Sequence, residues 1–183
     1  HNNLGNALQN LGKLDEAVVS YHKALAIKPD FVEAHTNLGA ALQELGKFDG
    51  AVASYRSALA IKSDSAELHA NLGNALAQLG HPGEAKKSYQ DALAINSDYA
   101  EAHNNSGNLL KAFGKTDDAL TSYQKALAIK PDYAEARYNL GTALHGLGRL
   151  NEAVEHMRKS IDIRPDYAEA HNNLGIVLHK LGQ

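Results

Sequence analysis

Histidines are the first residues in this sequence whose chemistry needs an explanation. There are ten, and five recur at multiples of 34 residues: His1, His35, His69, His103 and His171. Ligands of one zinc ion must lie within about 2.1 Å of it, whereas packed helices lie about 8–10 Å apart. No pair of histidines has the four-residue spacing that places two ligands on one helix face. We therefore expect no metal site and interpret the column as partly buried packing residues.

A column of asparagines points more directly to function. Its members follow the same period: Asn3, Asn37, Asn71, Asn105, Asn139 and Asn173. Asparagine is a mediocre helix former, so apolar packing does not explain it. A carboxamide offers two donors and one acceptor carbonyl, so a row of them can hold the backbone of an extended peptide with little regard to its sequence. The alternative is structural, namely that the amides hydrogen-bond across adjacent helices.

Polar side chains also surround this column. One helical turn further along, the row reads Asn6, Ala40, Asn74, Asn108, Thr142 and Ile176. Directly beside the column stand Asn2, Thr36, Ala70, Asn104, Tyr138 and Asn172. We predict that the asparagine column contacts a peptide together with Asn6, Asn74, Asn108 and Tyr138.

No catalytic or cofactor site emerges. The chain has no cysteine, which excludes thiol catalysis, thiolate metal sites and disulfides. It contains no phosphate-binding loop or dinucleotide fingerprint, and any nucleophile–base set recurs in neighbouring repeats. We expect a non-catalytic protein without a cofactor.

The charge balance and the hydropathy of the sequence limit the classes of partner that we expect. Lysine and arginine total 18 against 21 acidic residues, so the surplus of cations that a nucleic-acid binder needs is missing. No apolar run approaches the roughly 20 residues that span a bilayer. We expect neither nucleic acid nor membrane as a partner. We favour a cytoplasmic location, although no residue of the sequence determines the compartment.

The 34-residue period also predicts the helices that position these columns. Leu38, Leu42 and Leu45 share one face of a first helix that ends at Gly46, and Ala51, Tyr55, Ala58 and Leu59 share one face of a second. The second helix ends near a proline, as at Lys28-Pro29. Short loops make the two helices antiparallel neighbours.

Two further patterns refine this expectation. An aspartate three residues before a glutamate precedes each later first helix, as in Asp30/Glu33, Asp64/Glu67, Asp98/Glu101, Asp132/Glu135 and Asp166/Glu169. We interpret this pair as a capping box. Each first helix also contains a glycine: Gly5, Gly39, Gly73, Gly107, Gly141 and Gly175. Because glycine costs about 1 kcal/mol within a helix, we expect a side chain of the paired helix to approach it closely.

These motifs make the chain resemble the tetratricopeptide repeat family over essentially its whole length. The family's Leu-Gly-x-x-Leu, Ala-x-x-x-Tyr-x-x-Ala-Leu and Pro-Asp elements all fall at its spacings. The five histidines of the column stand where the family often has tryptophan, a departure that leaves the fold intact. The resemblance implies an all-α, right-handed superhelical solenoid of antiparallel helix pairs. It divides a single domain, residues 1–183, into repeats 1–31, 32–65, 66–99, 100–133 and 134–167 and a lone first helix, 168–183. It also places the asparagine column on the concave surface.

The preferred function is a protein-interaction scaffold that binds an extended polypeptide in this groove. The column resembles in particular the repeat arm of O-linked N-acetylglucosamine transferases, so a substrate-recognition arm of a larger glycosyltransferase is an alternative. A third possibility is a self-assembling module, because the last helix presents Leu174, Leu178 and Leu181 for end-to-end stacking. Ser106 replaces the core leucine of the other first helices, so we expect the fourth repeat to be the least stable.

Overall fold

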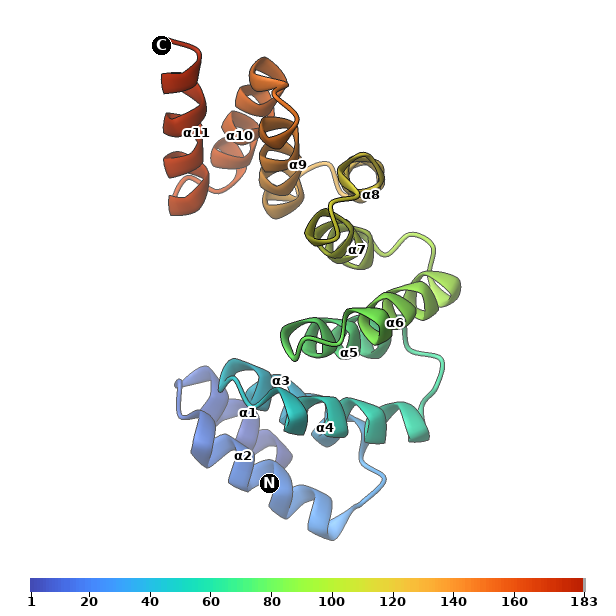
Figure 1. The fold of residues 1–183 in the computed structure, drawn as a ribbon. Helices are drawn as coiled ribbons and strands as arrows, with labels where there is room; N and C mark the ends of the chain where they lie inside the picture. The colour runs from blue at the N-terminus through green and yellow to red at the C-terminus, as the bar shows by residue number, and fades with distance from the viewer. Residues whose placement is uncertain (183) are drawn as a thin grey trace. The chain divides into compact units, whose positions relative to one another are not determined.

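The computed structural model describes residues 1–182, and every regular element in that range is an α-helix (Figure 1). The helices are α1 (Asn2–Asn10), α2 (Leu14–Ile27), α3 (Val32–Glu44), α4 (Phe48–Ile61), α5 (Ala66–Gln78), α6 (Pro82–Ile95), α7 (Ala100–Ala112), α8 (Thr116–Ile129), α9 (Ala134–Gly146), α10 (Leu150–Ile163) and α11 (Ala168–Lys180). The all-α prediction is confirmed. None of these helices is both long and apolar enough to cross a membrane.

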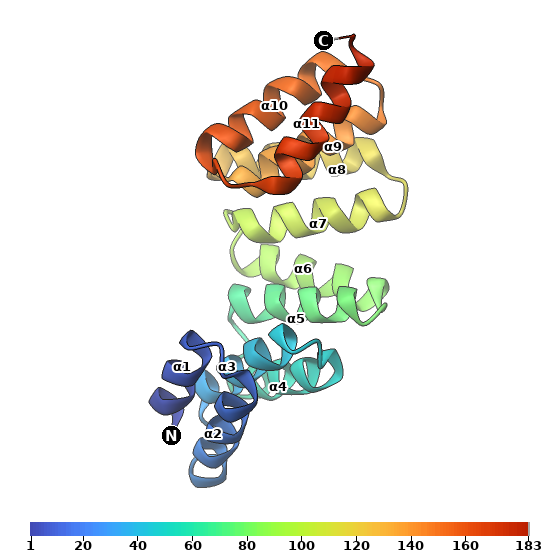
Figure 2. The same ribbon diagram turned by 90° about the vertical axis from the view of Figure 1, so that its left-hand side faces the viewer.

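The chain forms two compact units, one over His1–Ser97 with α1–α6 and a second from Asp98 onward with α7–α11. We call the odd-numbered helices first helices and the even-numbered helices second helices. Within each unit, the first helices α1, α3, α5, α7 and α9 each pack against the second helix that follows, and α11 packs against the second helix before it. The second helices α2, α4 and α8 also pack against the next first helix of their unit. Figure 2 shows α5 and α6 side by side in the first unit, and Figure 1 shows α10 between α9 and α11 in the second.

The first helices end as the glycine pattern predicts. At the end of α3, Gly46 has a φ of 71°, a conformation that a side chain disfavours. Its amide donates to the carbonyl oxygen of Gln43 at 3.0 Å, and the amide of Lys47 donates to that of Leu42 at 2.8 Å. This pair of bonds is a Schellman motif, which satisfies two carbonyls at the helix end.

The capping-box prediction is wrong. The first helices after each Pro-Asp pair begin two residues beyond the aspartate, because that pair forms a turn. In the first such turn, the amide of Phe31 donates to the carbonyl of Lys28 at 3.2 Å, which places Asp30 inside the turn. Phe31 is then the N-cap of α3 and has no side chain that can accept a hydrogen bond. Among α3, α5, α7, α9 and α11, only α5 has a side-chain cap, where Ser65 accepts from the amide of Leu68.

The glycines within α1, α3, α5, α7 and α9 do meet a side chain of the paired second helix, whereas a Cβ at Gly175 of α11 would meet nothing within 4 Å. A Cβ at Gly39 would lie 2.6 Å from Cε1 of Tyr55, and a Cβ at Gly107 would lie equally close to Cε1 of Tyr123. Both tyrosine side chains are almost completely buried. The expected close approach is confirmed for every first-helix glycine except Gly175, for which it is wrong. Where the neighbour is a tyrosine, it brings the hydroxyl toward the surface that carries the asparagines.

Candidate functional site

Each unit brings three members of the asparagine column onto its successive first helices. The first unit carries Asn3 on α1, Asn37 on α3 and Asn71 on α5, and the second carries Asn105, Asn139 and Asn173 on α7, α9 and α11. We call the surface that bears them the first-helix face of each unit. Asn3 is exposed, Asn139 is buried and the others are half-buried, so the side chains lie at the boundary between protein and solvent.

The amide nitrogens of this column connect adjacent first helices. Nδ2 of Asn37 donates to Oδ1 of Asn6 at 2.9 Å. In the second unit, Nδ2 of Asn139 donates to Oδ1 of Asn104 at 2.9 Å. Nδ2 of Asn173 donates to the hydroxyl of Tyr138 at 2.7 Å. The structural role that the sequence left open is therefore present, and it fixes these carboxamides in place.

The amide oxygens of the same residues are not used in this way. Within residues 1–182, Oδ1 of Asn37, Asn139 and Asn173 accepts no hydrogen bond. Asn71 makes no side-chain hydrogen bond at all in this range, because the residue equivalent to Asn6 in the preceding first helix is Ala40, which has no acceptor. At Asn37, Asn139 and Asn173 the column thus presents acceptor oxygens next to donors that are already engaged. At Asn105 the oxygen is used, because Oδ1 accepts from Nδ2 of Asn104 at 3.2 Å.

The second predicted row faces the tyrosines of the paired helices. Oδ1 accepts the tyrosine hydroxyl at 2.8–2.9 Å in three repeats: Tyr21 to Asn6, Tyr89 to Asn74 and Tyr123 to Asn108. Burial raises the pKa of all three tyrosines, so their hydroxyls remain protonated donors. These oxygens are therefore occupied within the protein.

Tyr138 extends the column on the second unit. Its ring lies 4.9 Å from that of Tyr167, between ring centroids, in a tilted arrangement. The guanidinium of Arg164 stacks 3.4 Å above the Tyr167 ring. Together with its bond to Asn173, this packing holds the half-buried Tyr138 beside the asparagines.

Two glutamates expected to cap helices instead hold asparagines that lie beside the column. Nδ2 of Asn2 donates to Oε1 of Glu33 at 2.9 Å, and Nδ2 of Asn104 donates to Oε1 of Glu135 at 3.1 Å. Asn2 and Asn104 are both buried. The shared spacing of 31 residues is the sequence signal that would have revealed these pairs.

The histidine column binds backbone at the inter-repeat turns. Nε2 of His35 lies 2.9 Å from the carbonyl oxygen of Pro29, and His171 makes the same contact to Pro165 at 2.8 Å. Because a carbonyl only accepts, the imidazole donates. Among residues 1–182, no three histidine, aspartate or glutamate side chains gather as a metal site would require.

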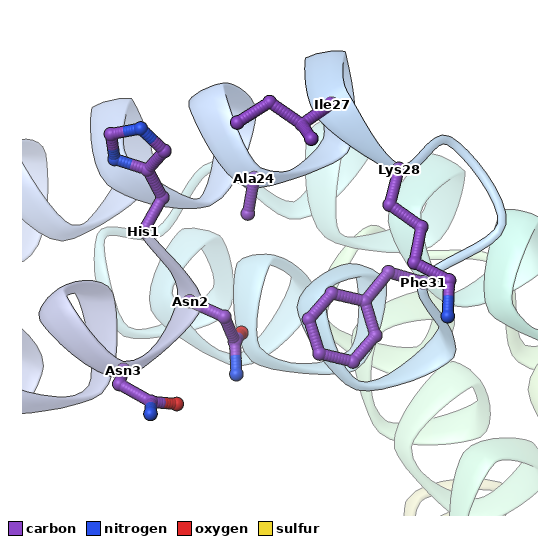
Figure 3. A pocket seen from close by; sticks show the side chains of 7 residues that line it. All are labelled: His1, Asn2, Asn3, Ala24, Ile27, Lys28 and Phe31. Atoms are coloured by element: carbon purple, nitrogen blue, oxygen red, sulfur yellow. The ribbon is translucent and has the colours of Figure 1, made fainter.

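A hollow of about 340 Å³ lies next to Asn3 at the start of α1 (Figure 3). Its wall combines the polar side chains of Asn2 and Asn3 with the apolar side chains of Ile27 and Phe31. The ammonium of Lys28 lies 5.3 Å from the Phe31 ring centroid. The first-helix face therefore has apolar surface beside its amides at this point.

Comparisons with known proteins agree with this architecture. A family model described as a TPR repeat matches residues 5–46, 41–80, 107–148 and 143–182, and one described as a tetratricopeptide repeat matches residues 66–99. None of the curated proteins matches the chain.

Several solved structures are similar to the chain over most of its length. MamA is 29% identical with a TM-score of 0.74, covering 90% of this chain and 96% of its own. YrrB, described as a TPR protein with an unusual peptide-binding site, is 27% identical with a TM-score of 0.67, covering 94% and 89%. PilW, a widely conserved type IV pilus biogenesis factor, is 26% identical with a TM-score of 0.88, covering 99% and 84%.

Proposed function

The chain belongs to the tetratricopeptide repeat family, a family of protein-interaction scaffolds, and from this premise we propose that it binds an extended polypeptide on the first-helix face. The observation that carries the proposal is an asymmetry at Asn37, Asn139 and Asn173 of the asparagine column, whose amide nitrogens are engaged while their amide oxygens accept nothing within residues 1–182. Backbone amides of an extended peptide are donors that match such acceptors.

The internal hydrogen bonds support ligand binding as well as folding. A carboxamide already fixed by its nitrogen loses little side-chain entropy when its oxygen accepts a hydrogen bond from a ligand. Each such bond contributes about 0.5–1.5 kcal/mol net, so three in one unit suit a modest, reversible affinity. The asparagine contacts involve only the backbone of the peptide. Any preference for particular peptide side chains therefore has to come from neighbouring positions, such as Tyr138 and the hollow next to Asn3.

The similarity to YrrB supports the same proposal, because that protein is described as having a peptide-binding site. Our proposal for this chain rests on its own asparagines. It involves no bond making or breaking, and the side chains of the first-helix face act only as hydrogen-bonding and packing groups.

Asn71 provides the sharpest test, because it has no side-chain partner within residues 1–182 to lose. Short unstructured peptides that differ in charge and apolar content are screened for binding by fluorescence polarisation. For a peptide that binds, Asn71→Ala is expected to weaken the affinity up to about tenfold, equivalent to one hydrogen bond, with little change in Tm. Asn139→Ala is expected to lower both affinity and Tm, since it also removes the bond to Asn104.

Gln90→Ala and Gln124→Ala are the matched controls, because they remove exposed carboxamides from the second helices α6 and α8. Both should bind as the native chain does. Equal affinity of Asn71→Ala and the native chain, together with a lowered Tm for Asn139→Ala, would show that the column serves the fold alone.

A further inference from the structure

Basic residues are distributed unevenly over the first helices. Helices α1, α3 and α5 of the first unit contain no lysine or arginine. In the second unit, Lys111 lies in the last turn of α7 and His145 holds the equivalent place on α9. On α11 the equivalent residue is His179, and Lys180 follows it directly. The second unit alone therefore carries basic side chains at this edge of its first-helix face.

Contacts between helices join these three residues into one row. Nζ of Lys111 donates to Oγ1 of Thr142 on α9 at 3.1 Å. Nζ of Lys180 lies 2.8 Å from Nε2 of His145, which must accept because an ammonium only donates. Thr142 in turn donates to the carbonyl oxygen of Asn139 at 2.8 Å, so this basic row adjoins the asparagine column.

The two ammonium groups of the basic row have neutral partners. Within residues 1–182, neither Lys111 nor Lys180 forms a salt bridge, whereas Lys130 and Lys159 of the same unit pair with carboxylates. Lys111 is an exposed residue, but the atoms packed around its ammonium partly desolvate the charged form and lower its pKa. A partly desolvated ammonium with only a hydroxyl partner gains more from a carboxylate than a fully solvated one does.

A simpler explanation is that cations at helix C-termini stabilise the helix dipole. The helix dipole alone does not explain the basic residues, because α3 and α5 of the first unit end without any. In addition, the hydrogen-bond partners of Lys111 and Lys180 are side chains of the neighbouring first helix α9, not the carbonyls at the ends of their own helices. The side chains thus extend along the face.

The opposite edge of the same face is acidic. Glu135 and Glu169 lie in the first turns of α9 and α11, and Glu135 accepts from Asn104. A ligand on the asparagine column therefore has carboxylates on one side and ammonium groups on the other. This arrangement repels an acidic side chain from one edge and attracts it to the other.

We propose that the basic row, Lys111, His145 and Lys180, binds carboxylate side chains of an acidic peptide that lies along the asparagine column of the second unit. The inference rests on the proposed function and specifies its ligand class. Both ammonium groups contact α9, at Thr142 and His145, which lie about one helical turn apart on that helix. A polyproline II peptide has three residues per turn, so acidic residues at every third position present their carboxylates on one side of the peptide, where they can face these two ammonium groups.

The probes are two labelled peptides, one a repeat of Pro-Ala-Asp and the other the neutral repeat Pro-Ala-Asn of equal length. The native chain is expected to bind the aspartate peptide about tenfold more tightly at low salt, and this preference should shrink as salt rises. Changing Lys111→Gln and Lys180→Gln together should abolish the preference. Changing Lys115→Gln and Lys125→Gln together, two exposed cations of the same unit, should preserve it.

The outcomes separate this inference from the proposed function. Equal binding of both peptides, weakened for each by Asn139→Ala, would overturn the basic row while the peptide-binding face stands. An equal loss of preference in the two double lysine variants would also overturn it, because the net charge of the chain and not the basic row would then determine the preference for the aspartate peptide. Absence of binding by either peptide, and by every peptide of the earlier screen, would overturn both proposals.

Discussion

The hydroxyl of Tyr123 on α8 donates a 2.8 Å hydrogen bond to Oδ1 of Asn108 on α7, and this bond links the buried interface of a helix pair to its first-helix face. The same link joins Tyr21 to Asn6 and Tyr89 to Asn74. It is missing where the asparagine is replaced, since Tyr55 faces a helix with Ala40 at that place. Natural variation along the chain thus provides an internal control for the bond.

Tyr123→Phe is expected to lower the free energy of unfolding by about 1 kcal/mol, because it removes a hydrogen bond that a part-buried amide oxygen accepts. Tyr55→Phe is the control, with an expected change within about 0.5 kcal/mol, since no asparagine accepts from that hydroxyl. Urea denaturation followed by circular dichroism measures both. Equal losses in the two variants would contradict an energetic role for the tyrosine–asparagine pair.

The helix glycines give a second pair of substitutions with opposite expected signs. Gly107→Ala places a Cβ 2.6 Å from Cε1 of Tyr123, and the resulting overpacking, about 1–3 kcal/mol, exceeds the gain of about 1 kcal/mol in helix propensity. At the equivalent Gly175 of α11, a Cβ would meet nothing within 4 Å. Gly175→Ala is therefore expected to stabilise that helix. Thermal melts of both variants give the signs, and stabilisation by Gly107→Ala would refute the close approach.

Ser106 marks the place where the fourth repeat lacks its apolar residue. The equivalent leucines of α3, α5 and α9 are buried, for example Leu38 at 3% and Leu140 at 2% exposure, while Ser106 is only half-buried. Ser106→Leu is expected to raise stability by about 1 kcal/mol, roughly half of what full burial of a leucine contributes. The corresponding rise in Tm is about 2–4 °C. Calorimetry measures it, with Ser106→Ala as the control, and an unchanged or lower Tm would contradict the weak-repeat hypothesis.

Short-range signals explain why the helices were predictable from the sequence. The leucine spacing, Gly46 and Pro29 each act within a few residues, and the period repeats them. The helix starts were less predictable, because one turn hydrogen bond, from Phe31 to Lys28, moves the cap away from Asp30. Local sequence does not distinguish an aspartate inside a turn from one at an N-cap.

The candidate site was predictable in its residues but not in its bonds. Periodicity alone identified the asparagine column. The partner of each amide, however, lies a whole repeat away and changes from repeat to repeat, as with Asn6 for Asn37, Asn104 for Asn139 and Tyr138 for Asn173. The basic row was not predictable from the sequence for a related reason. Lys111 and Lys180 become neighbours of α9 only when the second unit folds.

His156 on α10 makes the stability of the second unit dependent on pH. Its Nδ1 is buried without a hydrogen-bond partner among residues 1–182, and burial lowers the pKa of the imidazole, with Arg137 and Lys159 adding to the effect and Glu155 opposing it. A lowered folded pKa means that the unfolded chain binds the proton more readily. The stability contribution is therefore complete above about pH 6.5, the ordinary pKa, and is lost as pH falls through the folded value.

We expect the free energy of unfolding to fall between pH 7 and pH 5 with a contribution from His156 of at most about 1.4 kcal/mol per pH unit. His156→Ser should flatten this part of the profile. Serine occupies the equivalent position in the other second helices, where Ser54, for example, donates to the carbonyl of Gly50. His156→Gln also removes the titrating group, although glutamine does not occur at this position in the other second helices. It should flatten the dependence of the free energy of unfolding on pH equally, whatever the stability of the variant at pH 7. Denaturation curves at several pH values measure the slope, and an unaltered slope in both variants would show that His156 does not cause it.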